Sequence, residues 1–106
     1  INLKDFRLTF RSKYRAADIE PNKNSVVPGG LFEISKSDEK KLDIYEDFPS
    51  LYKKFYFNYN GKKVMTYTMV QKTPFRFPTE RYLNVVKRGY EDCDLDKKYL
   101  EKALVD

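Results

Sequence analysis

The sequence contains no histidine and no tryptophan, and its one cysteine, Cys93, has no second cysteine with which to form an internal disulfide. Without histidine, a Ser-His-Asp or Cys-His nucleophile pair and a zinc site with histidine ligands are excluded. The acidic neighbours Glu91, Asp92 and Asp94 disfavour the thiolate of Cys93, so we expect that residue to be a spectator. Without histidine, the acid–base chemistry of an enzyme with this sequence falls to Asp, Glu, Lys, Tyr or Cys.

Long apolar runs are also lacking. No stretch approaches the roughly 18 apolar residues of a membrane helix, and no apolar run follows the basic start as in a signal peptide. We therefore expect a cytoplasmic protein without a membrane partner. The length of 106 residues, with 41% hydrophobic and 35% charged residues, predicts one soluble domain. Nine Tyr and eight Phe predict that its core is aromatic rather than aliphatic.

The net charge of +5 is compatible with an anionic partner, but solubility alone explains it equally well. Residues 53–63 interleave lysine with aromatic side chains, a pattern found in platforms that bind single-stranded nucleic acid. A plain hairpin with solvated lysines has the same alternation. We therefore do not expect a nucleic-acid partner, and keep a nucleic-acid-binding module as an alternative.

The first part of the chain predicts a strand, a loop and a glycine-interrupted apolar stretch. Apolar and charged residues alternate over Asp5–Phe10, as in a half-buried strand, with one slip near its start. The charged stretch Arg11–Asn24 is interpreted as a loop that holds at most a short strand around Ala17–Glu20. The apolar stretch that follows is interrupted by Gly29 and Gly30, which indicate a bulge or a close approach of the backbone.

The dipeptide Asn60-Gly61 predicts a β-hairpin between Tyr52–Tyr59 and Lys62–Val70, because both turn residues tolerate positive φ. A two-residue turn sets the register, which places Tyr52 and Tyr67 on one face. Both faces of this hairpin are substantially apolar. We therefore expect an α+β fold in which a mixed, mainly antiparallel sheet curls toward a small barrel, with short helices beside it.

Three short helices complete the predicted fold. Each is preceded by a residue suited to capping a helix, namely Ser35, Thr79 or Asp96. The predicted helices are Lys36–Tyr45, Glu80–Arg88 and Lys97–Ala103.

Three carboxylates, Asp43, Glu46 and Asp47, gather at the C-terminal end of the first predicted helix, where the macrodipole is negative. Together with the apolar neighbours of this helix end, the dipole would raise the pKa of a carboxyl group toward the range useful for proton transfer. An ordinary solvated helix end is the other interpretation. The residues alone leave both open.

The motifs of this sequence stand in a familiar order. A glycine-led apolar run over residues 29–35 precedes the spacing Leu42-Asp43, Glu46 and Tyr52, which is followed by the strand around Tyr67. Over nearly all of its length the chain resembles the γ-glutamylcyclotransferase-like (AIG2-like) family. The resemblance implies that Glu46 is the catalytic acid–base. It also implies a set of substrate-binding residues, which are Tyr52, Tyr67, Tyr82, Gly29 and Gly30.

The resemblance implies an enzyme that releases 5-oxoproline from γ-glutamyl peptides or amines, with no metal and no cofactor. The α-amine of such a substrate is placed to close a five-membered ring on the δ-carbonyl, so one carboxylate suffices for the proton transfers. Asp43 is expected to be a helix-end or structural carboxylate. A non-catalytic or nucleic-acid-binding module on the same fold is the alternative.

Two departures from the family pattern stand out. Asp47 occupies a position at which many members have glycine, and the family's first strand, with its glycine loop, is absent before Ile1. We therefore expect an N-terminally incomplete domain that lacks backbone donors for the glutamyl group and the oxyanion. We also expect turnover near background for these 106 residues, and self-association through an uncovered sheet edge.

Overall fold

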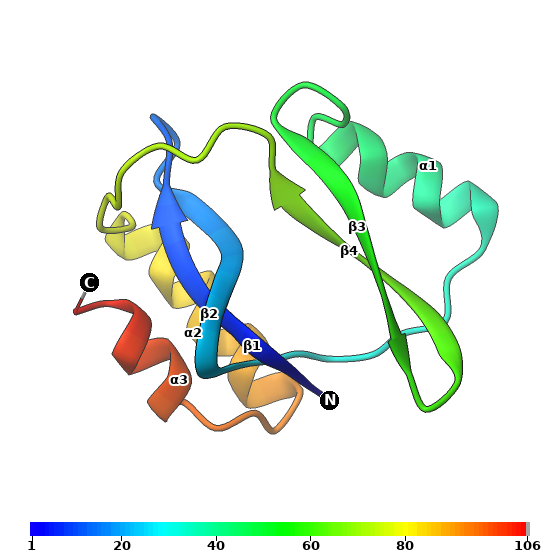
Figure 1. Ribbon diagram of the computed structural model, residues 1–106. Coiled ribbons are helices and arrows are strands. Elements are labelled where there is room, and N and C mark those ends of the chain that lie inside the picture. Colours follow the sequence, from blue (N-terminus) through cyan, green and yellow to red (C-terminus); the bar gives the residue numbers. More distant parts are fainter. Residues whose placement is uncertain (106) are drawn as a thin grey trace. The chain divides into compact units, whose positions relative to one another are not determined.

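The computed structural model describes residues 1–105, which form seven elements in the order β1, β2, α1, β3, β4, α2 and α3 (Figure 1). The strands make two antiparallel sheets of two strands each, β1 with β2 and β3 with β4. The chain divides into two compact units, one formed by residues 1–31 together with residues 72 onward, the other by residues 32–71. The organisation as a single domain stays a prediction.

In the first unit, β1 (Asn2–Arg11) pairs with β2 (Ala16–Pro28), and the two strands have one apolar and one charged face. Phe10 of β1 is fully buried and lies in the core of this unit. The helices α2 (Glu80–Asp92) and α3 (Lys98–Ala103) supply the rest of that core. Its other buried members are Leu83, Tyr90, Leu100 and Ala103.

The interpretation of Arg11–Asn24 as mainly a loop was wrong, because most of this stretch belongs to β2. Its charged residues alternate along the strand, and Glu20 lies opposite Arg7 in the ladder. A charged stretch that would indicate a loop in isolation thus forms a strand, because its charged side chains find partners on the neighbouring strand. The slip predicted near the start of β1 is confirmed: the register shifts between Lys4 and Phe6, where Asp5 has a φ of 63°.

In the second unit, α1 (Lys36–Tyr45) precedes the hairpin of β3 (Tyr52–Tyr59) and β4 (Lys62–Met69), as predicted. The Ser35 side chain accepts a hydrogen bond from the Asp38 backbone N–H, and the Asp38 carboxylate accepts one from the Ser35 backbone N–H. This capping box satisfies two donors at the helix start. At the hairpin turn, Asn60 and Gly61 have φ values of 49° and 79°, which confirms the predicted turn.

The predicted barrel is not formed. Within residues 1–105 the two sheets stay separate, and only one isolated bridge, between Arg11 and Phe75, extends the first of them. Pro28 ends β2, and Pro74 and Pro78 interrupt the stretch after β4; proline has no N–H to donate to a ladder. The chain therefore cannot carry a continuous strand from one sheet into the other at these points.

The last two helices differ from the prediction only at their ends. Helix α2 continues to Asp92 rather than ending at Arg88. Helix α3 begins at Lys98, and Oδ1 of Asp96 accepts a hydrogen bond of 3.0 Å from the Lys98 backbone N–H. None of the helices formed by residues 1–105 is long and apolar enough to cross a membrane.

Candidate active site

Helix α1 ends in a tight turn that carries Glu46. The backbone N–H of Phe48 donates to the carbonyl of Asp43 at 2.8 Å, and that of Asp47 donates to the carbonyl of Ile44 at 3.2 Å. Asp47 has a φ of 53°, in the left-handed region. These two bonds and the left-handed residue form a Schellman motif, the arrangement that commonly closes a helix and that favours glycine at the left-handed position. The presence of aspartate there adds local backbone strain beside Glu46.

Asp43 is held by two side chains of the hairpin. Its Oδ1 accepts a hydrogen bond of 2.6 Å from the Tyr67 hydroxyl, and its Oδ2 lies 3.0 Å from Nζ of Lys54. The hydrogen bond from Tyr67, with a smaller contribution from Lys54, lowers the pKa of Asp43 below its ordinary value. Burial and the bond to Asp43 raise the pKa of Tyr67. Asp43 is therefore a fixed, ionised carboxylate at neutral pH.

Glu46 is in a different environment, although it lies only three residues further along the chain. Its side chain is half-buried, and no group within residues 1–105 forms a hydrogen bond or ion pair with its carboxylate. Burial raises the pKa of Glu46 above its ordinary value. Of the three acidic residues at this helix end, Glu46 alone combines partial burial with a carboxylate free to exchange a proton.

Two of the predicted substrate-binding residues, Tyr52 and Tyr67, lie in the same unit as Glu46. Tyr52 pairs with Met69 and Lys54 with Tyr67, so Tyr52 and Tyr67 are on one face of the hairpin, as the turn predicted. Tyr52 is buried. The Tyr67 hydroxyl contacts Asp43 rather than Glu46.

The other predicted substrate-binding residues, Gly29, Gly30 and Tyr82, lie in the first unit. The N–H of Gly29 donates to the carbonyl of Ile1 at 2.9 Å, and its carbonyl accepts a hydrogen bond of 2.8 Å from the Ile1 nitrogen. A β-carbon at Gly29 would meet no atom within 4 Å, so no close approach of the chain requires glycine there. The Tyr82 hydroxyl accepts a hydrogen bond of 3.0 Å from the N–H of Ala17.

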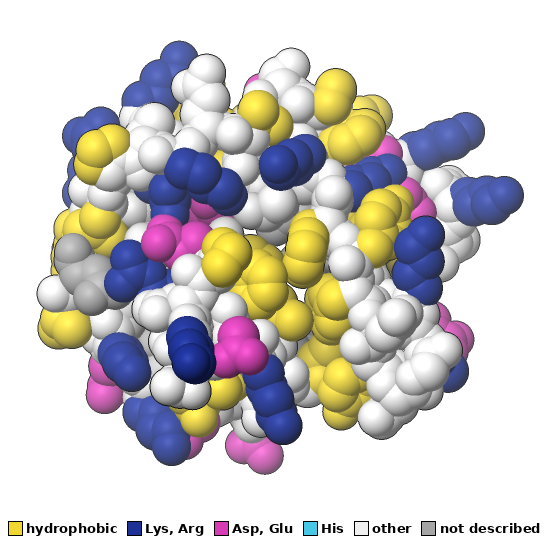
Figure 2. Space-filling model, viewed as in Figure 1, with side chains coloured by type: hydrophobic (Ala, Val, Ile, Leu, Met, Phe, Trp, Pro, Cys, Tyr) yellow, Lys and Arg dark blue, Asp and Glu magenta, His cyan; other side chains and the backbone are white. Residues whose placement is uncertain are grey.

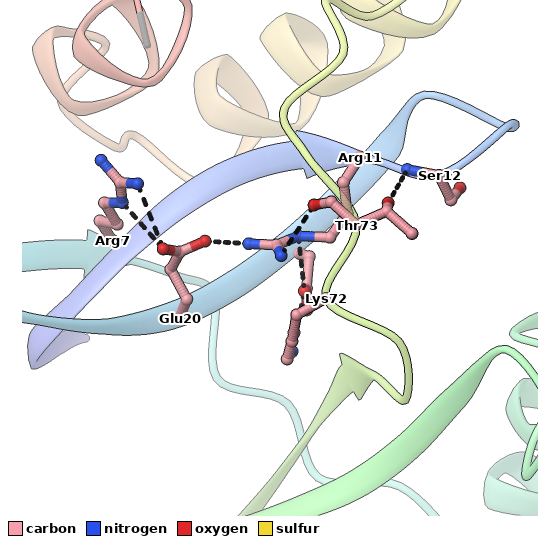
Figure 3. Close-up of polar contacts among 7 residues, drawn as sticks. Arg7, Arg11, Ser12, Glu20, Lys72 and Thr73 are labelled. Atoms are coloured by element: carbon pink, nitrogen blue, oxygen red, sulfur yellow. Dashed lines mark hydrogen bonds and ion pairs between the residues drawn. The ribbon is translucent and has the colours of Figure 1, made fainter.

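A partly buried ionic cluster lies on the charged face of the β1–β2 sheet, and sequence reasoning missed it (Figure 3). Asp18 lies 3.2 Å from Nε of Arg11 and 2.8 Å from Nζ of Lys72, and Glu20 bridges Arg11 and Arg7. The charges thus alternate in sign along the cluster. The spacing of two between Asp18 and Glu20 is a strand signal that could have revealed part of it.

This cluster also holds the chain segment that follows β4. The guanidinium of Arg11 donates to the Thr73 carbonyl at 3.1 Å, and the backbone N–H of Ser12 donates to Oγ1 of Thr73 at 3.0 Å (Figure 3). The N–H of Arg76 donates to the carbonyl of Phe10 at 2.8 Å. These contacts are structural, since all the charged groups have opposite charges beside them.

On the face shown in Figure 2, the lysine and arginine side chains of each unit have acidic side chains among them. Nucleic-acid platforms concentrate positive charge along the path of the backbone they bind. This face therefore gives no support to the nucleic-acid alternative. In the part of the chain that the structure describes, no group of three or more Cys, Asp or Glu side chains could hold a metal ion.

The chain thus has an α+β architecture, with the half-buried Glu46 at the C-terminal end of helix α1. The family model described as γ-glutamyl cyclotransferase, AIG2-like, matches residues 2–89. The chain belongs to this family, which confirms the resemblance seen in the sequence. Comparisons with curated proteins and with solved structures find no significant match.

Proposed function

We propose that this protein releases 5-oxoproline from γ-glutamyl peptides or amines, with Glu46 as the acid–base group. Membership of the γ-glutamyl cyclotransferase family supports a cyclotransferase-type activity. The observation that carries the assignment of Glu46 is the contrast with Asp43. Asp43 is occupied by Tyr67 and Lys54, whereas the half-buried Glu46 carboxylate has no such partner within residues 1–105.

In the proposed reaction, the Glu46 carboxylate takes a proton from the α-ammonium of the substrate. The neutral α-amine then attacks the δ-carbonyl carbon, a new C–N bond closes the five-membered ring, and the bond to the leaving amine breaks. Glu46 returns the proton to that amine, and the second proton, which the attacking nitrogen loses on becoming the ring N–H, converts the departing amine to its ammonium form. No covalent enzyme intermediate is required, because a well-oriented intramolecular nucleophile reaches effective concentrations on the order of 10⁵ M or more.

The raised pKa of Glu46 suits both halves of this proton transfer. A general base and acid is most efficient when its pKa lies near the working pH, and burial moves the pKa of Glu46 in that direction. In this proposal the ring of Tyr67 forms an apolar wall while its hydroxyl is engaged with Asp43. Substrate binding by Tyr52, Tyr82, Gly29 and Gly30 stays a prediction.

The test compares wild type, Glu46→Gln and the matched control Glu33→Gln, an exposed glutamate in the same unit. Each is assayed for 5-oxoproline release from γ-glutamyl dipeptides and γ-glutamyl p-nitroanilide, both as the 106-residue chain and in any longer form that its gene encodes. We expect Glu46→Gln to lower the rate by about 10²–10⁴-fold, because the amide keeps the shape but cannot accept the proton. Glu33→Gln should match wild type.

Two results would overturn the proposal. One is 5-oxoproline release by Glu46→Gln at close to the wild-type rate, which would remove Glu46 from the chemistry. The other is failure of wild type, in its longest form, to release 5-oxoproline from any of these γ-glutamyl amides.

A further inference from the structure

Lys54 of β3 contacts two carboxylates of α1 and a residue of the helix-ending turn. Its Nζ lies 2.5 Å from Oε2 of Glu39 and 3.0 Å from Oδ2 of Asp43, two residues one helical turn apart. The same ammonium lies 4.7 Å from the centre of the Phe48 ring, within the range of a cation–π contact. The Lys54 side chain is only 16% exposed. One cation thus contacts residues both before and after Glu46.

Tyr67 of β4 is the cross-strand partner of Lys54. Its hydroxyl donates to Oδ1 of Asp43 at 2.6 Å, while Lys54 takes Oδ2. Both oxygens of one carboxylate are therefore held by a single cross-strand pair. This fixes the orientation of the Asp43 side chain more strictly than either contact alone, because rotation of the carboxylate would break at least one of them.

Backbone hydrogen bonds also close the turn between Asp43 and Phe48, two residues whose side chains contact Lys54. The N–H of Phe48 donates to the Asp43 carbonyl, and the N–H of Leu51 donates to the carbonyl of Asp47 at 2.9 Å. The turn over residues 43–48 therefore begins and ends at residues whose side chains contact Lys54. Glu46 lies inside this turn without any side-chain partner of its own within residues 1–105.

We propose that the Lys54–Tyr67 pair holds the turn over residues 43–48 and so positions the Glu46 carboxylate for proton transfer. Lys54 and Tyr67 are positioning residues in this inference: they act through Asp43 and Phe48 and do not touch the reacting atoms. The inference rests on the proposed role of Glu46. It also gives the hydroxyl of Tyr67 a role distinct from substrate binding, because that hydroxyl donates its hydrogen to Asp43.

The kinetic test uses Lys54→Met, which keeps the aliphatic stem, and Tyr67→Phe, which removes one oxygen. We expect Lys54→Met to lower kcat about 10–100-fold, because small displacements of a catalytic group have effects of this size. KM should change less than about threefold, since no substrate contact is lost. Tyr67→Phe should lower kcat less than Lys54→Met, because the cation remains. Lys54→Arg should restore most of kcat, because arginine keeps the charge and can donate to both carboxylates.

Two matched controls lie on the same strand. Lys53→Met makes the same substitution at the adjacent exposed position, and Tyr56→Phe removes a hydroxyl from an exposed tyrosine in the middle of β3. Both should keep wild-type kcat and KM. A rise in KM with unchanged kcat in Tyr67→Phe would overturn the inference, because it would make the Tyr67 hydroxyl a substrate contact.

Amide hydrogen exchange supplies a readout that does not require activity. We expect the Phe48 amide to exchange on the order of tenfold faster in Lys54→Met and Tyr67→Phe, and at the wild-type rate in both controls, because exchange reports local opening. An unchanged exchange rate of the Phe48 amide in both variants would overturn the inference, whatever the activity of Glu46→Gln. Faster exchange together with full activity of Glu46→Gln would contradict the proposed function. It would still support the part of the inference in which Lys54 and Tyr67 hold the turn.

Discussion

Oδ2 of Asp18 lies 3.2 Å from Nε of Arg11, and the Asp18 side chain has no exposed surface. Lys72 approaches the same oxygen at 2.8 Å. Removing charges from water is costly, so a buried pair adds little net stability compared with apolar residues of the same volume. The removal of one partner is a different matter, because it leaves the other charge buried and uncompensated.

We therefore expect Asp18→Asn to lower the free energy of unfolding by about 3 kcal/mol, the lower end of the range for breaking a buried pair, since Arg11 retains Glu20 and Thr73. Urea denaturation measures the change. Asp96→Asn is the matched control: its pair with Lys98 is exposed, and asparagine still accepts the Lys98 N–H, so the change should stay below about 0.5 kcal/mol. Equal effects of the two substitutions would contradict the structural role of the cluster.

The left-handed backbone at Asp47 leads to a second prediction, on the free energy of unfolding. A left-handed conformation costs most residues about 1–2 kcal/mol and aspartate less, because its short polar side chain can form local hydrogen bonds; glycine there costs about 0.5–1 kcal/mol of chain entropy. Asp47→Gly should therefore change the free energy of unfolding by less than about 1 kcal/mol, and Asp47→Val should lower it by about 1 kcal/mol. The control Asp92→Gly, at the helical end of α2, should lower stability by about 0.3 kcal/mol. Thermal or urea unfolding that ranks valine above glycine at position 47 would count against this turn.

The raised pKa of Glu46 predicts a pH dependence of stability. Because the folded state binds this proton more tightly than the unfolded state, the stabilisation is fully present below the ordinary value of 4.5 and is lost as pH rises through the folded pKa. The Glu46→Gln variant has no carboxyl group to ionise at this position, so it does not lose stability in this way. Its stability relative to wild type should therefore increase as pH rises above 4.5 and then level off. Urea denaturation from about pH 4 to about pH 8 measures this difference.

The contribution of Asp43 to stability should have the opposite dependence on pH. Its pKa is lowered, chiefly by the Tyr67 hydrogen bond, so its contribution is present above the ordinary value of 3.8 and is lost as pH falls through the folded pKa. Asp43→Asn should be less stable than wild type at neutral pH, and the difference should shrink in acid. In Tyr67→Phe the same acid-dependent loss should be smaller. A difference that stays constant with pH in both variants would mean that Asp43 is not held by Tyr67.

Several features of this protein follow from neighbouring residues alone. Asn60 and Gly61 accept positive φ, and a two-residue turn leaves one register, so the pairing of Lys54 with Tyr67 was predictable. Ser35 and Asp38 satisfy each other's donors within one helical turn, which sets the start of α1. The position of Glu46 at the end of that helix follows from the same local rules, and the family resemblance supplied its predicted role.

Other features depend on residues far apart in the chain. The stretch around Asp18 was predicted to be mainly a loop, because its charges find partners only across the strand pair and at Lys72, 54 residues away. The expected barrel failed for a related reason: closure depends on which strand edges meet, and local patterns do not specify that. The difference between Asp43 and Glu46 was also decided by tertiary structure. Both lie at one helix end, but only Asp43 meets the hydroxyl of Tyr67, 24 residues away, and it is such contacts and burial that set a carboxyl group's pKa.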